Sequence, residues 1–324
     1  MKKTLITGGA GFIGSHLIDT LLTKENTITV LDNLTTGTPQ NIQQWLGNPN
    51  LTFIKADLLN PVALKKLEPN HYDTIFHLAA NPEVKIGATN PKIHFQQNIT
   101  ATHNLLETIR KSNSKPTLVF TSTSTVYGEP TKIPTPENYA PLKPISTYGA
   151  SKLASEALIS AYAHTYNFKA IIIRLANIVG PRSQHGVVHD FIQKLNKNPN
   201  KLEILGDGTQ NKSYLYITDC INAILLTLQK SKEQVNIYNI GSEDQTTVTE
   251  IAKIITQEMG IKNVKFKFTG GVDGGRGWKG DVKNMLLDIS KLKTHEWKPK
   301  YNSQQAITKT VKHLTNQPLA SKMD

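Results

Sequence analysis

A glycine-rich segment near the N-terminus constrains the fold of this chain more than any other feature. The segment TGGAGFIG, residues 7–14, follows directly on a short β-rich run, and a helical pattern comes after it. Gly9, Gly11 and Gly14 satisfy the pattern GxGxxG, and with Gly8 the segment also satisfies GxxGxxG. Between a strand and a helix, such glycines allow a tight turn, a close approach of the backbone to a pyrophosphate and close packing of helix on strand. The free N–H groups of a helix N-terminus favour phosphate, so the segment predicts a dinucleotide-binding βα unit.

Short β-rich runs alternate with helical patterns through the first half of the chain, which has 324 residues. One helical pattern is Asn98–Arg110, where apolar residues recur at helical spacing. Strands that alternate with helices imply a parallel, doubly wound sheet and hence an α/β fold. The expected strands are Thr4–Thr7, Thr27–Leu31, Leu51–Lys55, Thr74–Leu78, Thr117–Thr121, Ala170–Leu175 and Val235–Ile240.

The pattern becomes less regular after Ala176, and the length of the chain suits two closely associated domains. A helix is expected from about Val248 to Met259, and residues 262–297 look like a smaller α/β appendage. We expect residues 1–176 with about 215–261 to form the dinucleotide-binding domain. Residues of about 177–214 with 262–324 are expected to form a smaller, substrate-binding domain.

Asp32 stands at the end of the second expected strand, about 20 residues after the glycines, where dinucleotide-binding units carry an acidic residue. A carboxylate there accepts hydrogen bonds from both ribose hydroxyls and repels a 2′-phosphate, which favours NAD over NADP. The alternative is a loop aspartate that begins an Asx turn with Asn33. Asp57, after the third strand, is a weaker candidate for contact with the adenine amine.

Tyr148 and Lys152 lie four residues apart at the start of a long helical pattern, so they share one face of that helix. A free tyrosine has a pKa of about 10 and is a poor base at neutral pH. A nearby ammonium group and the positive nicotinamide ring would lower that pKa and make Tyr148 a general base for an alcohol. The alternative is that the two side chains are unrelated residues on an amphipathic helix.

These features, with further segments, resemble the extended short-chain dehydrogenase/reductase superfamily and its NAD-dependent epimerase/dehydratase family, from Lys3 to about Trp297. Within the family, the sequence most resembles the UDP-glucose 4-epimerase branch. The resemblance implies a doubly wound parallel Rossmann sheet with a smaller C-terminal α/β domain that binds a nucleotide sugar. The matching segments are TGGAGFIG, DNLTTG (32–37), HLAA (77–80), TSTSTVYG (121–128), PISTYGASK (144–152), ANIVGPR (176–182), GDGTQNKSYLYITD (206–219), YNIGS (238–242) and GDV (280–282).

The resemblance also assigns positions around the cofactor, NAD. They comprise the glycine loop, the acid after the second strand with its neighbours, and residues that follow later strands. The cofactor-binding residues implied in this way are Gly8, Gly11, Phe12, Ile13, Gly14, Asp32, Asn33, Thr36, Gly37, Asp57, Leu58, Leu78, Ala79, Ala80, Asn98, Thr121, Tyr148 and Lys152.

The family's catalytic Ser or Thr stands five residues before the glycine of the VYG element, which is Thr123 here. It is implied to hydrogen-bond the sugar oxygen that is oxidised and to help move its proton to Tyr148, with Lys152 as the third catalytic residue. Related dehydratases carry Asp-Glu at the next two positions, and UDP-glucuronate decarboxylases carry Glu at the second. Ser124 and Thr125 stand there instead, and neither acts as an acid or base near neutral pH. The pattern therefore favours oxidation and reduction at C4 without elimination.

The resemblance is less uniform on the substrate side. Lys212 stands where many relatives have Arg, and it lacks the bidentate fork of a guanidinium. Arg276 lies five residues before Asp281, whereas the family signature has an Arg three residues before its Asp. Met285, near a position that gates N-acetyl groups in relatives, does not settle the sugar. The implied substrate-binding residues are Lys85, Ser122, Thr123, Tyr148, Asn177, Lys212, Arg276 and Asp281.

We therefore expect an NAD-dependent UDP-hexose 4-epimerase that interconverts UDP-glucose and UDP-galactose through a transient 4-keto sugar, with NAD bound tightly. An epimerase of UDP-N-acetylhexosamine or UDP-glucuronate is the alternative, and Lys85 or Arg182 could supply a cation for the uronate. A non-catalytic NAD-binding scaffold is a remote alternative, because the set of Tyr148, Lys152 and Thr123 is intact.

The helix that begins at Tyr148 has apolar residues on two sides, which is typical of a doubly buried helix. One stripe, expected to face the sheet, comprises Ala150, Leu153, Ala154, Ala157, Leu158 and Ala161, and the other comprises Ile159, Tyr162 and Tyr166. With the helix over residues 98–110, the second stripe is expected to form the four-helix interface of a homodimer, as the resemblance implies. Burial against the second domain of the same chain is the alternative.

Composition points away from several other kinds of protein. Cys220 is the only cysteine, so the chain has no internal disulfide or thiolate zinc site, and His185 and His189 lack an acidic partner motif for a metal. The net charge of +12 comes from dispersed lysines, which favours a solvated surface over nucleic-acid binding. The apolar run Ala170–Gly180 is too short for a membrane span and contains Arg174, so we expect no membrane partner and a cytoplasmic location.

Overall fold

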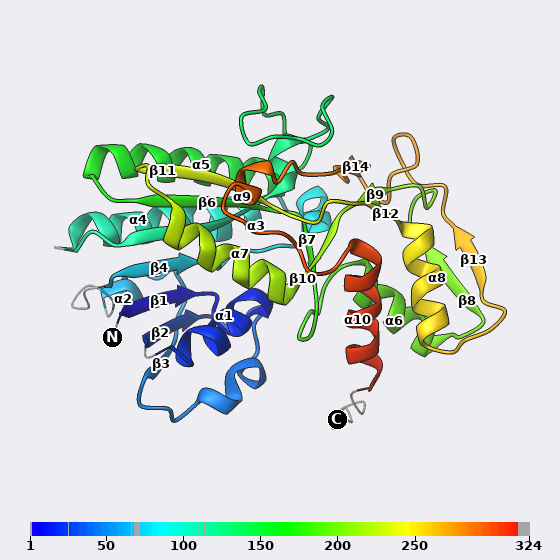
Figure 1. Cartoon of the computed structure of the whole chain (residues 1–324), viewed down its shortest axis with the longest axis horizontal. Coiled ribbons are helices and arrows are strands. Elements are labelled where there is room, and N and C mark those ends of the chain that lie inside the picture. The colour runs from blue at the N-terminus through cyan, green and yellow to red at the C-terminus, as the bar shows by residue number, and fades with distance from the viewer. Residues whose placement is uncertain (1, 25, 66, 68–71, 113, 317–324) are drawn as a thin grey trace.

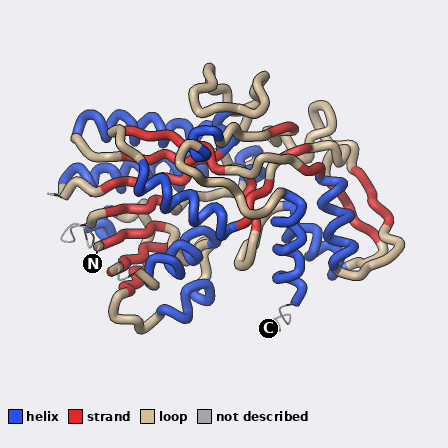
Figure 2. The backbone as a smooth tube through the Cα atoms, viewed as in Figure 1, coloured by secondary structure: helices blue, strands red, loops and turns tan. Residues whose placement is uncertain are grey.

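The computed structural model describes residues 2–24, 26–65, 67, 72–112 and 114–316. Its centre is a seven-stranded parallel sheet with the order β11-β6-β5-β4-β1-β2-β3 (Figures 1 and 2). The direction of winding reverses between β1 and β4, as in a doubly wound sheet. The strands are β1 Lys3–Thr7, β2 Thr27–Asp32, β3 Leu51–Lys55, β4 Thr74–His77, β5 Thr117–Thr123, β6 Ala170–Leu175 and β11 Val235–Ile240.

Every strand expected from the sequence is present in this sheet, so the predicted α/β fold with a doubly wound parallel sheet is confirmed. The bounds differ by one or two residues at several ends. Strand β2 includes Asp32, β4 stops at His77, and β5 continues to Thr123. The longer β5 carries the hydroxyl-rich segment to the carboxyl edge of the sheet, where ligands of such folds bind.

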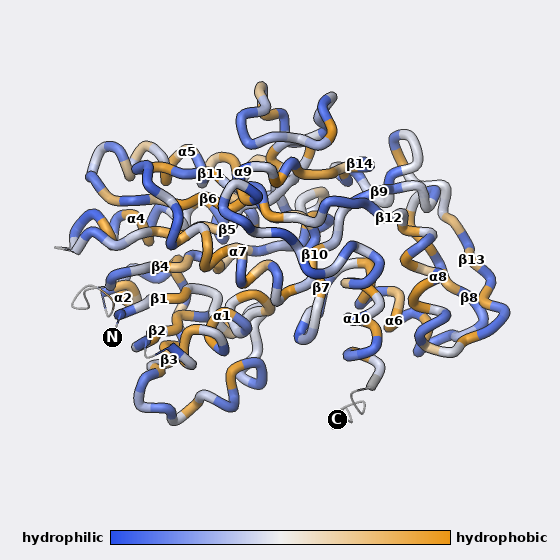
Figure 3. Tube along the Cα trace, in the orientation of Figure 1, coloured by the Kyte–Doolittle hydropathy of each residue, from blue (hydrophilic) through white to orange (hydrophobic). Residues whose placement is uncertain are grey.

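Helices cover both faces of the sheet (Figure 1). On one face lie α1 Phe12–Leu22 and α7 Ile217–Lys230, and on the other α2 Pro61–Lys65, α4 Ala101–Lys111 and α5 Thr147–Tyr166. Because side chains alternate along a strand, β1 contributes to both layers. Ile6 packs in the cluster with α1, and its neighbour Leu5 packs in the cluster with α4. Hydrophobic residues accordingly recur along the strands of the sheet (Figure 3).

Helix α4 follows a short turn, α3 Lys92–His94, and a π-helical turn, η3 Phe95–Thr100. The helix expected over Asn98–Arg110 is therefore present, but its first residues have π geometry. Its periodic apolar face packs toward the sheet, because Thr102, Leu105, Leu106 and Ile109 are buried.

A smaller lobe lies beside the sheet. It contains α6 Val187–Lys197, α8 Val248–Glu258 and α10 Ser303–Asn316, with the parallel strands β8 Lys201–Ile204 and β13 Lys265–Phe268 (Figure 1). Helix α8 packs mainly on α6, α10 and β8. This packing groups residues 248–258 with the smaller lobe, whereas the expected division placed them with the sheet. The end of that division, residues 317–324, lies outside the described residues.

Shorter elements connect the two lobes. Strands β7 Asn177–Val179 and β10 Tyr214–Tyr216 pair in parallel, and β9 Asn211–Lys212 pairs with β12 Thr246–Thr247 and β14 Asn284–Met285. The other helical elements are η1 Pro39–Trp45, η2 Val84–Ala88, η4 Ser124–Tyr127 and α9 Ser290–Lys293. Among the described residues, no helix combines the length and apolar character that crossing a membrane requires.

Helix α5 turns a different face to the sheet from the one expected. Ile159, which was assigned to an outer stripe, is fully buried in the hydrophobic cluster with β5 and β6. Ala150, Ala157 and Ala161, which were expected to face the sheet, are exposed. The prediction was wrong because polar side chains occupy much of the inward face. The buried residues of α5 are Gly149, Ser151, Lys152, Ser155, Glu156, Ile159 and Ala163.

A buried ion pair joins α5 to the sheet. Arg174 of β6 donates from Nη2 to Glu156 Oε2 at 2.7 Å and from Nε to Glu156 Oε1 at 3.1 Å, and both side chains are at most 5% exposed. Its Nη1 donates to the hydroxyl of Tyr127 and to the carbonyl of Glu137, each at 3.0 Å. Each guanidinium nitrogen therefore has an acceptor, as a buried charge requires.

We predict that Arg174→Met destabilises the protein by about 3–5 kcal/mol, because it leaves the Glu156 carboxylate buried without its counter-charge. The double variant Arg174→Met with Glu156→Leu should recover a large part of that loss, since no unpaired charge remains. Denaturant unfolding measures both. Lys312→Met, which removes an exposed pair with Glu258, is the control and should change the free energy of unfolding little. A double variant as unstable as the single one would contradict this account.

Candidate active site

A cavity of about 560 Å³ opens at the carboxyl ends of the central strands and is lined by both lobes. The glycine loop follows β1, Asp32 ends β2, Leu78 follows β4, and residues 121–125 end β5. The smaller lobe contributes residues from the start of α6, and the connecting strand β9 contributes Lys212. Parallel sheets bind ligands at this edge, near the point where the winding reverses.

The glycine loop passes close to the backbone after β4. Gly8 has φ +73°, and a Cβ on it would lie 2.7 Å from the backbone nitrogen of Ala79. A Cβ on Gly14 would lie 2.7 Å from the Cα of Gly9, so the start of α1 could not pack so closely on the loop. Gly11 forms the N-cap of α1 without a side chain over the helix end. This backbone leaves the approach that a pyrophosphate needs, as the sequence predicted.

Asp32 lines the cavity at the end of β2. Its Oδ2 accepts the N–H of Ala10 at 2.9 Å, and its Oδ1 accepts the N–H of Leu34 at 2.8 Å. Burial raises the pKa of this carboxyl, while the two backbone donors act in the opposite direction. Asp32 therefore both accepts the Asx-type hydrogen bond of a local turn and lines the cavity, so the two alternatives do not exclude each other.

Most of the other expected cofactor residues also line this cavity. Asn33 donates from Nδ2 to Asp57 Oδ2 at 2.9 Å and so joins the loops after β2 and β3. Gly37 and Asn98 do not line the cavity, although Gly37 lies beside Asp32. The expected cofactor residues on the wall are Gly8, Gly11, Phe12, Ile13, Gly14, Asp32, Asn33, Thr36, Asp57, Leu58, Leu78, Ala79, Ala80, Thr121, Tyr148 and Lys152.

Asn98 lies behind the wall because its carboxamide is engaged elsewhere. Its Oδ1 accepts the N–H of Asn81 at 2.8 Å, and its Nδ2 donates to Ser151 Oγ at 2.9 Å. The Ser151 hydroxyl in turn donates to the carbonyl of Tyr148 at 2.7 Å. Asn98 is thus placed to support the loop after β4 and the first turn of α5 from behind.

The three expected catalytic residues meet at one place on the wall. Thr123 ends β5, and Tyr148 and Lys152 lie on successive turns at the start of α5. Burial raises the pKa of Tyr148 to about 12, and a hydrogen bond with Thr123 acts in the opposite direction. In the protein alone, burial outweighs the hydrogen bond and keeps the pKa of Tyr148 raised, and the expected lowering depended also on the charge of the nicotinamide ring.

Lys152 is buried beside the aromatic ring of Phe120, with Nζ 4.0 Å from the ring centroid. Burial lowers the pKa of Lys152 to about 7, and the negative charge of Glu156 acts in the opposite direction. An ammonium in this position can hold the hydroxyls of a ribose or favour a neighbouring phenolate.

The two residues after Thr123 carry hydroxyls, as in the sequence, and both line the cavity. Thr125 donates its N–H to Thr123 Oγ1 at 3.2 Å, and the two threonine hydroxyls are 3.1 Å apart. No carboxylate stands at these positions to donate a proton to a leaving group.

His77, at the end of β4, is a packed residue. Its Nδ1 is 2.7 Å from Thr7 Oγ1, and its Nε2 is 2.9 Å from Thr102 Oγ1. Thr102 gives its own hydrogen to the carbonyl of Asn98, so it accepts from Nε2–H, and Thr7 donates to Nδ1. Burial, helped by the charge of Lys152, lowers the pKa of His77 to about 3, which keeps the ring neutral.

On the substrate side, Asp281 Oδ1 accepts from Lys212 Nζ at 2.6 Å, and Asp281 Oδ2 accepts the N–H of Gly277 at 3.2 Å. Asn177 donates from Nδ2 to the carbonyl of Ser213 at 3.1 Å. The expected substrate residues on the cavity wall are Lys85, Ser122, Thr123, Tyr148, Asn177, Lys212 and Asp281.

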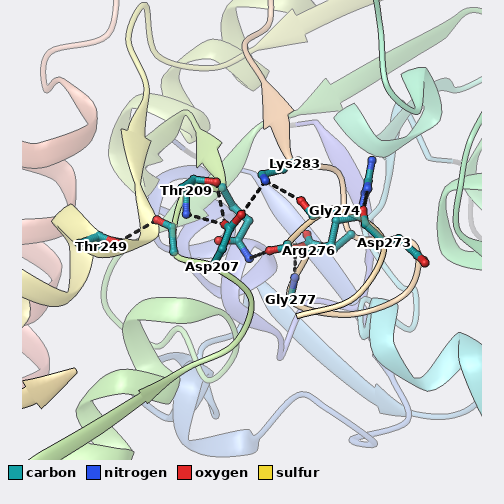
Figure 4. Close-up of polar contacts among 12 residues, drawn as sticks. Asp207, Thr209, Thr249, Asp273, Gly274, Arg276, Gly277 and Lys283 are labelled. Carbon is teal, nitrogen blue, oxygen red and sulfur yellow. Dashed lines mark hydrogen bonds and ion pairs between the residues drawn. The ribbon is translucent and has the colours of Figure 1, made fainter. Parts of the chain in front are cut away.

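Arg276 does not belong to this wall, contrary to expectation. It pairs with the carboxylate of Glu129 and donates to the carbonyl of Asp273, within the loop that Lys283 fastens to Asp207 at 2.8 Å (Figure 4). Its position five residues before Asp281, not three, was the signal of this difference.

Trp278 stands three residues before Asp281 and lines the cavity, and it was not among the residues expected from the sequence. The ammonium of Lys85 is 4.8 Å from its ring centroid, and that of Lys212 is 5.8 Å away. Its buried indole N–H has no hydrogen-bond partner among the described residues. Met285 is buried and does not line the cavity.

His185 and His189 lie on the cavity wall, before and within α6. Among the described residues, no group of three or more His, Cys, Asp or Glu side chains is arranged to hold a metal ion.

Comparison with known proteins agrees with this geometry. Residues 4–241 match the model of the NAD dependent epimerase/dehydratase family. A relative from Methanocaldococcus jannaschii, provisionally named a UDP-glucose 4-epimerase, is 34% identical over 316 residues, which are 96% of this chain and 98% of the relative.

Two solved structures share the fold over nearly the whole chain. A crystal structure of UDP-galactose 4-epimerase is 38% identical with a TM-score of 0.85 and covers 97% of this chain and 98% of its own. A UDP-glucuronic acid 4-epimerase from Bacillus cereus, in complex with UDP-glucuronic acid and NAD, is 30% identical with a TM-score of 0.85 and covers 97% and 99%. With its glycine loop and Asp32 at the cavity, this chain belongs to the NAD-dependent epimerase/dehydratase family, and NAD is its cofactor.

Proposed function

We propose that this chain is a UDP-sugar 4-epimerase that interconverts UDP-glucose and UDP-galactose. The observation that carries the proposal is the meeting of Thr123, Tyr148 and Lys152 on one cavity wall, next to two residues without carboxylates. Such a set can oxidise and reduce an alcohol but lacks the acid for elimination. The similarity to 4-epimerases of UDP-sugars supports the same activity.

In the proposed reaction, Tyr148 exchanges a proton with the oxygen on C4 of the sugar, and Thr123 holds that oxygen by a hydrogen bond. Bound NAD supplies the hydride acceptor and donor, and its oxidised ring supplies the positive charge that Tyr148 needs to act as a base. Lys152 lies one turn from Tyr148 and holds the cofactor side in place. The 4-keto sugar would turn within the cavity before reduction on its other face. Each turnover would restore NAD, so the cofactor can stay tightly bound.

The substrate-binding residues in this proposal are Lys85, Ser122, Asn177, Lys212 and Asp281, with Trp278 added from the cavity wall. UDP-N-acetylhexosamine and UDP-glucuronate remain alternative substrates. Lys85 favours the uronate, because its ammonium lies on the wall and is only weakly engaged, 3.8 Å from Asp190. Arg182 is less available, because it pairs with Asp19 at 2.8 Å.

The function is tested by incubating the purified protein with UDP-galactose and following UDP-glucose by NMR. We expect interconversion of this pair at a higher rate than of the N-acetyl and uronate pairs. A higher rate on either of those would replace the substrate but keep the activity. Turnover of none of the three pairs, in protein that contains NAD, would favour a non-catalytic NAD-binding scaffold.

We predict that Thr123→Val lowers turnover by about 100-fold or more, because it removes the hydroxyl that handles the proton beside Tyr148. Ser124→Ala and Thr125→Val should cost far less, because their hydroxyls are not placed between sugar and base. Steady-state kinetics on the preferred sugar pair measures all three. Equal losses at the three positions would undo the assignment of Thr123.

We also propose that the chain forms a homodimer through a four-helix interface built from α4 and α5. The outward face of α5 is lined by small residues, among them the exposed Ala150, Ala157 and Ala161. Phe95, in the turn before α4, is 60% exposed. The small side chains on α5 and the exposed Phe95 before α4 suit close packing against a second copy. Ile159 is buried under α5, so a charge there would test folding and not association.

We predict that Ala157→Glu converts the dimer to a monomer, because it introduces two charges into a packed interface. Light scattering coupled to size exclusion measures the mass. Lys253→Glu, on the exposed side of α8, is the control and should leave the mass unchanged. A wild-type monomer, or a dimer that survives Ala157→Glu, would refute this interface.

The expectations of a cytoplasmic location and of no nucleic-acid partner stay predictions.

A further inference from the structure

Ser122 lies on the cavity wall next to Thr123, yet its hydroxyl is bonded to a residue behind the wall. The side chain is buried, and it stands opposite Arg174 in the register of β5 and β6. Its hydroxyl contacts Glu156 Oε1. Glu156 is on α5, one turn beyond Lys152, and does not line the cavity.

Arg174 fixes the direction of this hydrogen bond. Glu156 accepts from Nη2 of the guanidinium at 2.7 Å and from Nε at 3.1 and 3.2 Å. A carboxylate that faces a guanidinium has no hydrogen to give, so the hydrogen between the two residues comes from Ser122. A serine hydroxyl has one hydrogen and two lone pairs. Toward the cavity, Ser122 can therefore only accept.

Thr123, the next residue, differs in this respect. Its Oγ1 accepts the N–H of Thr125, and its hydroxyl lies within hydrogen-bond distance of both Thr125 Oγ1 and Tyr148. Its hydrogen is not held by a carboxylate, so it can point to either partner, as a residue that passes protons must. The two adjacent hydroxyls therefore differ. That of Thr123 can both donate and accept a hydrogen bond, whereas that of Ser122 can only accept one toward the cavity.

We propose that Ser122 is a fixed acceptor for a hydrogen-bond donor of the bound ligands, and that Glu156 is the positioning residue that sets its direction. The inference rests on the proposed function, which brings two such donors to this wall, the carboxamide N–H of the nicotinamide and the hydroxyls of the sugar. The shared chemistry is a neutral N–H or O–H donor. Because Ser122 has no free hydrogen, it anchors a ligand without competing with Thr123 for the proton.

The test is a double-mutant cycle with Ser122→Ala, Glu156→Gln and the two combined, in which the KM for the UDP-sugar is measured on NAD-loaded protein and the Kd for NAD by adding NAD back to protein freed of it. Ser122→Ala should weaken ligand binding by about three- to tenfold, the loss of one neutral hydrogen bond. Glu156→Gln should weaken it at least as much, because the carboxamide can turn its NH₂ to Ser122 and force that hydroxyl to point at the ligand's donor. In the Ser122→Ala background, Glu156→Gln should have no further effect on binding.

The Kd for NAD and the KM for the UDP-sugar together show whether the donor belongs to the nicotinamide or to the sugar. A higher Kd for NAD with unchanged KM for the UDP-sugar identifies the nicotinamide, and the reverse identifies the sugar. Ser124→Ala is the matched control, and melting temperatures of all variants separate binding from folding. Ser122→Ala with both constants unchanged in an active enzyme overturns the inference, as does a Glu156→Gln loss of equal size in both backgrounds. A wild type that binds NAD but turns over no UDP-sugar would instead overturn the proposed function.

Discussion

The buried pair of Arg174 and Glu156 is the interaction on which the arrangement of the active site depends. It joins the middle of α5 to β6 and, through Ser122, to β5. Its other arm holds Tyr127, whose hydroxyl donates to Asn239 Oδ1 at 2.8 Å, and Asn239 Nδ2 donates to the carbonyls of Thr135 and Asp288 at 2.9 and 3.1 Å. One network therefore joins α5, β5, β6 and β11 to the two loops that carry Thr135 and Asp288.

This network explains how a helix with a polar inner face stays on the sheet. Tyr148, Lys152 and Glu156 follow one another at four-residue spacing, so the stripe that would normally be apolar carries the chemistry. Desolvation of Lys152 disfavours its charged form, and two buried charges alone contribute little net stability. The fully buried apolar side chains of α5, Ile159 and Ala163, lie beyond the site. The ion pair thus sets the position of α5 more than it adds stability.

The same feature marks the limit of what could be predicted from the sequence. The glycine loop and Asp32 could be placed because their conformations are local and follow a strand directly. The strands could be placed because buried parallel strands are continuous apolar runs. The inward face of α5 was misassigned because hydrophobic periodicity assumes that the buried face is apolar. Asn98 was placed on the wall, but its amide is taken up by Asn81 and Ser151, which only the tertiary structure reveals.

The substrate side depends still more on contacts between distant segments. The ring of Trp278 lies near the ammonium groups of Lys85 from η2 and of Lys212 from β9, and Lys212 pairs with Asp281. The partners in each of these contacts are far apart in sequence, so no short spacing pattern predicts the contacts. Arg276, by contrast, matches a residue type of the family signature but points to Glu129. A cofactor-binding site built largely from backbone geometry can be recognised from a short motif. A sugar nucleotide is bound by side chains that come together only in the folded protein. For this reason the sequence predicts the reaction type of the site better than it predicts which sugar is bound.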